Sequence, residues 1–127
     1  MRQSGSRPKF LDLTRIRQPV GAIVSIAHRI SGILLFLLIP VVIYLLELSL
    51  KSESGYAQVM VLFDSTAMKL LAWIGIWSLV HHVLAGIRFL LLDVEIGVER
   101  RAARTSAMAV NVISGISLLL SAMWIFL

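Results

Sequence analysis

Three long apolar stretches alternate with short polar segments along this chain. The stretches run from about 20 to 47, from about 68 to 92 and from about 105 to 127. With a rise of about 1.5 Å per residue, each is long enough to cross the ~30 Å hydrocarbon core of a bilayer as an α-helix. The pattern predicts an all-α membrane protein with three transmembrane helices, made of an N-terminal segment, 1–18, and one transmembrane domain, 19–127.

The polar segments between the spans have the residue types of loops. Lys51 to Asp64 contains Ser, Glu, Gly and Gln, and Asp93 to Arg104 mixes acids with a run of arginines. We therefore expect two connecting loops. Pro40 lies inside the first apolar stretch, and a membrane helix tolerates proline because neighbouring groups satisfy the freed carbonyl.

Composition supports a membrane rather than an aqueous environment. The chain has 127 residues, of which 58% are hydrophobic and 15% charged, and its mean hydropathy is +0.90. A soluble chain of this size could not bury so much apolar surface. The net charge of +5 is better explained by membrane topology than by nucleic-acid binding, so no nucleic-acid partner is expected. The absence of cysteine excludes disulfides, iron–sulfur ligation and covalent c-type haem in this chain.

The distribution of basic residues predicts the orientation in the membrane. Of the 12 lysines and arginines, only Lys51 and Lys69 flank the first loop, and the other ten lie toward the N-terminal segment and the second loop. The positive-inside rule places those two segments in the cytoplasm and the C-terminus in the periplasm. The first 18 residues have no apolar core of signal-peptide length and form no convincing presequence. We therefore expect a multi-pass protein of a bacterial inner membrane.

Two adjacent histidines, His81 and His82, lie deep inside the second apolar stretch. An imidazole in hydrocarbon needs a partner for each ring nitrogen. Ser78 and Gly86 lie one turn before and one turn after His82, and such small residues would let a flat porphyrin approach that helical face. We predict that His82 ligates the iron of a b-type haem; an interhelical hydrogen bond is the alternative. His81 points about 100° away, which favours a structural hydrogen bond, although it remains the other candidate ligand.

The start of the first span carries a second polar cluster, Ser25, His28 and Arg29. Ser25 and Arg29 are four residues apart and share one helical face. His28 and Arg29 could bind haem propionates, whereas Ser25 with Arg29 could bind the carbonyl oxygens of a quinone. Alternatively, the two basic side chains extend to lipid headgroups and the Ser25 hydroxyl bonds back to its own helix. His28 is closer to the interface than His82, so it suits a propionate better than iron, and a partner chain must supply the second axial ligand.

Three motifs in this order resemble the cytochrome b membrane-anchor subunit of succinate dehydrogenase. They are R-P-x-x-L-D-L-x-x-I-R-x-P over 7–19, S-I-x-H-R-I-S-G over 25–32 and H-x-x-x-G-I-R-x-L-L-x-D over 82–93. Each motif alone is modest evidence, but the three together are specific, and the resemblance covers nearly the whole chain. Relatives often have a second histidine after G-I-R, where this chain has Phe89.

The resemblance implies a set of roles. Ser25 and Arg29 would belong to a ubiquinone site, and His82 would be one axial ligand of haem b. The second axial histidine would come from another anchor subunit, so this chain would be half of a heterodimeric membrane-anchor helix bundle. A flavoprotein and an iron–sulfur subunit would dock on the cytoplasmic face, and the chain would not be catalytic alone. Two alternatives remain open: an anchor of a fumarate reductase, or a haem-free structural membrane subunit.

Overall fold

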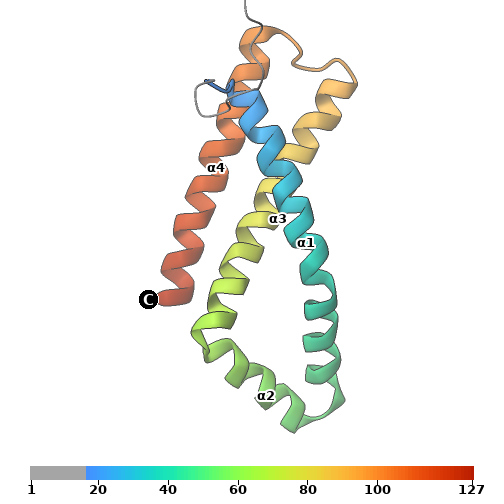
Figure 1. Cartoon of the computed structure of the whole chain (residues 1–127), viewed down its shortest axis with the longest axis vertical. Coiled ribbons are helices and arrows are strands. Elements are labelled where there is room, and N and C mark those ends of the chain that lie inside the picture. The colour runs from blue at the N-terminus through green and yellow to red at the C-terminus, as the bar shows by residue number, and fades with distance from the viewer. Residues whose placement is uncertain (1–16) are drawn as a thin grey trace, which may run out of the picture.

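The computed structural model describes residues 17–127, which form four helices. Their bounds are α1 (Val20–Lys51), α2 (Glu53–Asp64), α3 (Thr66–Asp93) and α4 (Arg100–Phe126). Three long helices run side by side, and α2 slants across the end at which α1 and α3 diverge (Figure 1). The predicted all-α class is confirmed. The expected N-terminal segment and the motif that begins at Arg7 lie largely outside the described residues.

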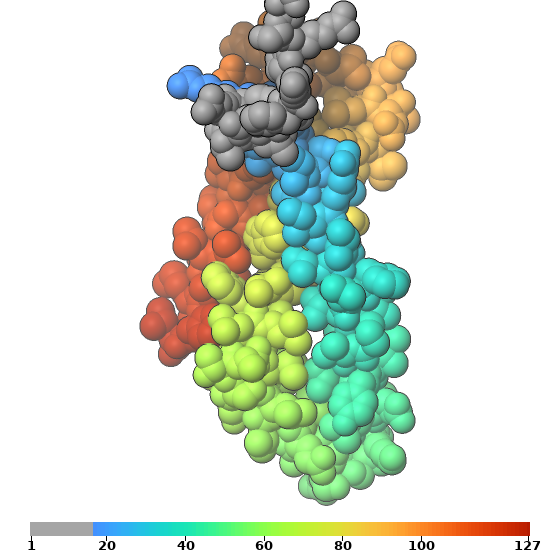
Figure 2. Space-filling model, viewed as in Figure 1, coloured from blue at the N-terminus to red at the C-terminus, as the bar shows by residue number. Residues whose placement is uncertain are grey.

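Three of these helices, α1, α3 and α4, are long and apolar enough to cross a membrane. Each apolar stretch of the sequence lies mostly within one of them, although α4 begins at Arg100, before the expected start. Large apolar side chains such as Leu37, Leu90 and Leu119 point outward and are more than half exposed. Figure 2 shows an elongated molecule with bulky side chains standing out along α1. Such a surface is stable only when lipid or other transmembrane helices cover it.

The prediction of a loop over 51–64 was wrong, because this segment contains α2. Ser52 is the N-cap of α2, and Ser65, just after this segment, is the N-cap of α3. Composition alone did not reveal either cap. The Ser52 hydroxyl accepts a hydrogen bond from the Gly55 amide at 3.0 Å, and the Ser65 hydroxyl accepts one from the Met68 amide at 3.3 Å. Each bond satisfies an amide that the first turn of a helix leaves without a partner. The chain therefore passes from α1 to α3 through a short helix. The second expected loop is present as residues 94–99.

The three long helices come together around small residues near the start of α1 and of α4. Val24, Ala85, Ala107 and Val110 form the buried core cluster there. Because lipid tails are as apolar as leucine, membrane helices associate through close packing, which small side chains permit. Farther along, the Trp73 indole nitrogen donates a hydrogen bond to the Leu118 carbonyl at 2.8 Å and links α3 to α4.

Arg88 provides a second link between α3 and α4. Its guanidinium is buried and donates from Nε to the Ser106 hydroxyl and from Nη2 to the Ala103 carbonyl, both at 3.0 Å. A charge in such a position is stable only when its donors are satisfied. These two bonds therefore fix the start of α4 against the end of α3.

Replacing Arg88 with leucine should weaken this link. We expect the free energy of unfolding to fall by about 1.5–3 kcal/mol, the range for a hydrogen bond that involves a charged group. Thermal unfolding of the purified protein in detergent measures the change. Leu90→Ala, on the exposed side of the same helix, is the matched control. An equal loss in both variants would show that the Arg88 bonds contribute nothing specific.

Candidate functional site

The imidazole of His82 turns from α3 toward α1. Its Nδ1 lies 3.2 Å from the His28 carbonyl oxygen and 3.2 Å from the Ser31 hydroxyl. A carbonyl oxygen only accepts hydrogen bonds, so Nδ1 must carry the proton. The fully buried Ser31 hydroxyl donates to the same carbonyl at 2.8 Å, which leaves its oxygen as a second acceptor for Nδ1. In the neutral ring, the lone pair of His82 is therefore on Nε2.

Gly32 permits the close approach of α1 and α3, and Gly86 lies at ordinary contact distance from the His28 ring. The His28 ring stacks on the His82 ring, with centroids 4.1 Å apart and planes inclined by 9°. A Cβ at Gly32 would lie 3.0 Å from Cε1 of His82, and one at Gly86 would lie 3.5 Å from Nε2 of His28. We expected Gly86 to leave room for a flat group beside His82; the His28 ring lies against it instead.

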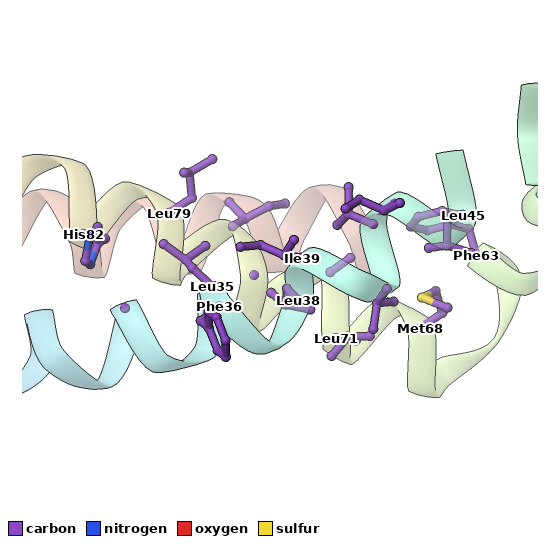
Figure 3. A pocket seen from close by; sticks show the side chains of 17 residues that line it. Leu35, Phe36, Leu38, Ile39, Leu45, Phe63, Met68, Leu71, Leu79 and His82 are labelled. Carbon is purple, nitrogen blue, oxygen red and sulfur yellow. The ribbon is translucent and has the colours of Figure 1, made fainter. Parts of the chain in front are cut away.

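An apolar groove of about 760 Å³ runs between α1 and α3. Figure 3 shows His82 at one end of it and Phe63 and Met68 at the other. His82 is the one lining residue with an ionisable side chain, and Gly32 lies beside it. The groove therefore offers a single imidazole at the edge of a long apolar surface. This arrangement suits a largely apolar ligand that needs one nitrogen donor.

His81 points the other way, into the contact with α4. Its ring is buried, its Nδ1 lies 3.1 Å from the Ser114 hydroxyl, and it stacks on Trp77 with centroids 5.5 Å apart. The interhelical hydrogen bond expected for His81 is thus present. Its Nε2 is buried without a hydrogen-bond partner among the described residues, as is the Ser78 hydroxyl. Nε2 of His81 is thus enclosed by protein, whereas His82 borders the groove.

Ser25 and Arg29 lie near the start of α1, away from the groove. Ser25 is half-buried and Arg29 is exposed, one turn farther along the same helix. Neither residue lines the groove. The structure therefore brings His28 and His82 together but leaves Ser25 and Arg29 on an open surface.

Sequence reasoning missed the support that Ser31 and Ser114 give to the two histidines. Ser31 had a local signal, since it is a small polar residue one turn after His28 in an apolar helix. Ser114 had none, because only the packing of α3 against α4 pairs it with His81. Within residues 17–127, no cluster of three or more His, Cys, Asp or Glu side chains could hold a metal ion. A metal ion bound here would therefore need ligands from a prosthetic group or from another chain.

Comparison with known proteins identifies the family. The model for the succinate dehydrogenase/fumarate reductase transmembrane subunit matches residues 3–127. The chain belongs to this family. The predicted resemblance to the cytochrome b membrane-anchor subunit of succinate dehydrogenase is thereby confirmed, and the chain is a multi-pass membrane subunit of that type.

Three relatives carry the name succinate dehydrogenase cytochrome b556 subunit. The protein from Coxiella burnetii is 40% identical over 97% of this chain and 99% of its own length. The protein from Paracoccus denitrificans is 31% identical over 83% of this chain and 81% of its own length. The protein from Rickettsia prowazekii is 29% identical over 85% of this chain and 84% of its own length. The similarity to the first therefore extends over essentially the whole of both chains.

The contact at Gly32 yields a stability prediction. Alanine in place of a helical glycine normally stabilises a helix by about 0.5–1 kcal/mol. Gly115→Ala should show this gain, because nothing lies within 4 Å of the added Cβ. Gly32→Ala should show none, because its Cβ would press on the His82 ring at 3.0 Å. Parallel thermal unfolding of the two variants makes the comparison; equal gains would mean that the His82 ring can move without cost.

Proposed function

We propose that this chain is the cytochrome b anchor of a bacterial inner-membrane succinate dehydrogenase, with a cytoplasmic N-terminus and a periplasmic C-terminus. In this role His82 ligates a b-type haem shared with a second anchor subunit. The observation that carries the proposal is the bond from Nδ1 of His82 to the His28 carbonyl. Histidines that ligate metals donate from their other ring nitrogen in this way, which fixes the tautomer and the ring orientation. The names of the relatives support the same cofactor.

The residues around His82 fit such a group. The groove beside the ring is apolar and about 760 Å³ in volume, which suits the edge of a macrocycle. Gly32 leaves space for the imidazole on the α1 side, where an added Cβ would crowd it. When bound, the haem supplies a reversible one-electron carrier. The chain's own contribution is to present one nitrogen at a fixed orientation and to exclude water around it.

The second axial ligand has to come from another chain. The His28 and His82 rings stack with their centroids 4.1 Å apart, so the two together would not hold one haem iron between them. His81 is directed into the α3–α4 contact. His28, His81 and His82 are the three histidines of the sequence. His28 is better placed, together with Arg29, to bind a propionate, because a guanidinium and an imidazole both donate to carboxylates.

Ubiquinone reduction would use the open surface at the start of α1. The Ser25 hydroxyl can donate to a quinone carbonyl, and the Arg29 guanidinium stabilises negative charge that develops on the oxygen during reduction. Both side chains are at least partly accessible, and the iron–sulfur and second anchor subunits would enclose the site. Succinate oxidation belongs to the flavoprotein subunit, so this chain is not catalytic alone.

Substitution of the two adjacent histidines tests the ligand assignment. In the assembled complex, His82→Gln should abolish the low-spin b-type difference spectrum, because the iron loses one axial nitrogen. His81→Gln is the matched control and should keep the spectrum, since glutamine can still bond to Ser114. Reduced-minus-oxidised absorption of each purified complex makes the measurement.

The reverse result would transfer the ligand role to His81. A full low-spin spectrum in both variants would remove this chain from the iron altogether. The shared site also requires that the chain expressed alone binds haem poorly and that coexpression with its partner restores binding. Complete haem loading of the isolated chain would contradict it.

Arg29→Ala tests the quinone site. Loss of a charged hydrogen bond should lower succinate-dependent ubiquinone reduction about tenfold or more. Reduction of a soluble artificial acceptor by the catalytic head should not change. Lys51→Ala, an exposed cation at the opposite end of α1, is the control for charge. Equal loss of both activities with Arg29→Ala would indicate failed assembly rather than a quinone role.

A further inference from the structure

A surface recess with three arginines lies at the start of α4. Arg100, Arg101, Arg104, Thr105 and Met108 line this recess, whose volume is about 510 Å³. All five residues are exposed. The first turn of α4 contains no acid, and the side chain of Glu99 does not cap the helix. Three positive charges are thus concentrated within little more than one helical turn, and positive charge at the start of a helix is unfavourable without an anion nearby.

The helical face that carries the arginines becomes apolar farther along α4. Met108, Val112, Leu119 and Met123 follow the arginines at helical spacing on nearly the same side. Their side chains are between 47% and 67% exposed. Gly115 adds open space on this side, since nothing lies within 4 Å of a Cβ built there. The surface is therefore strongly basic at one end and apolar for several turns beyond it.

This face is separate from the surfaces already assigned. The inner side of α4, with Ala107, Val110 and Ser114, is buried in the bundle. The groove that holds His82 lies between α1 and α3, and no residue of α4 lines it. A second anchor subunit that completes a haem site at His82 would approach that groove. The peripheral subunits would dock at the cytoplasmic end, where the arginines lie, so the experiment below also tests protein docking at this face.

We propose that this face of α4 binds an anionic phospholipid. The phosphate would lie among Arg100, Arg101 and Arg104, and an acyl chain would extend along Met108, Val112 and Leu119. Arginine forks bind phosphate oxygens bidentately, and basic clusters next to a transmembrane helix attract anionic lipids. The apolar continuation distinguishes a lipid from a free phosphate, which would use only the arginine end.

The test uses the intact complex reconstituted in phosphatidylcholine nanodiscs that contain a minor fraction of phosphatidylglycerol. Native mass spectrometry measures the retained phosphatidylglycerol. The triple variant R100Q/R101Q/R104Q should weaken its relative affinity about 100-fold, from about fivefold for each basic residue at the surface. The double variant K51Q/K69Q, at the opposite membrane side, should leave retention unchanged. Where the triple variant does not assemble, R101Q alone should give the fivefold loss.

The other outcomes overturn the proposal. Unchanged phosphatidylglycerol retention in the triple variant would exclude the arginines as the headgroup site. Release of the peripheral subunits with lipid retention unchanged would assign the surface to protein docking. Competition by inorganic phosphate as strong as that by phosphatidylglycerol would assign it to a free anion. The haem spectrum is recorded in parallel, so a failure here is distinguishable from a failure of the His82 assignment.

Discussion

The hydrogen bond between His82 and the His28 carbonyl joins α3 to α1. In hydrocarbon, an imidazole without a partner costs several kcal/mol, so the bond holds α3 against α1 and also fixes the tautomer. A carbonyl accepts and never donates, which directs the proton to Nδ1 and leaves Nε2 free. Ser31 reinforces this arrangement because its own proton is already given to the same carbonyl. The hydrogen bond that ties the two helices together is thus also the one that would orient His82 for the proposed ligand role.

The adjacent histidines, His81 and His82, have different neighbours. A step of about 100° around α3 turns His82 toward the groove and His81 toward Ser114 on α4. Each ring uses Nδ1 for a contact with a neighbouring helix. Nε2 of His81 is then enclosed by protein, whereas His82 borders an open apolar surface. Helix α3 is thus fixed by histidine hydrogen bonds to α1 on one side and to α4 on the other.

Much of this architecture follows from the sequence, and the exceptions have definite physical causes. Apolar length alone locates the three spans, because backbone groups in lipid have to bond within a helix. Helix α2 was missed because its start is marked by the Ser52 N-cap, which composition does not reveal. Helical spacing predicted the different directions of His81 and His82, about 100° apart. It could not predict that His28 lies against Gly86, since that contact depends on the crossing of α1 and α3.

The packing of α1 against α3 also shapes the groove beside His82. Helices α1 and α3 approach closely where Gly32 lies against the His82 ring, and they diverge toward α2. The divergence opens the groove, whose apolar walls are stable only when another apolar surface covers them. One imidazole, that of His82, borders the groove. In the proposed role the stacked His28 and His82 rings would not hold one haem between them, so a helix of a partner subunit would supply the other ligand and cover the groove.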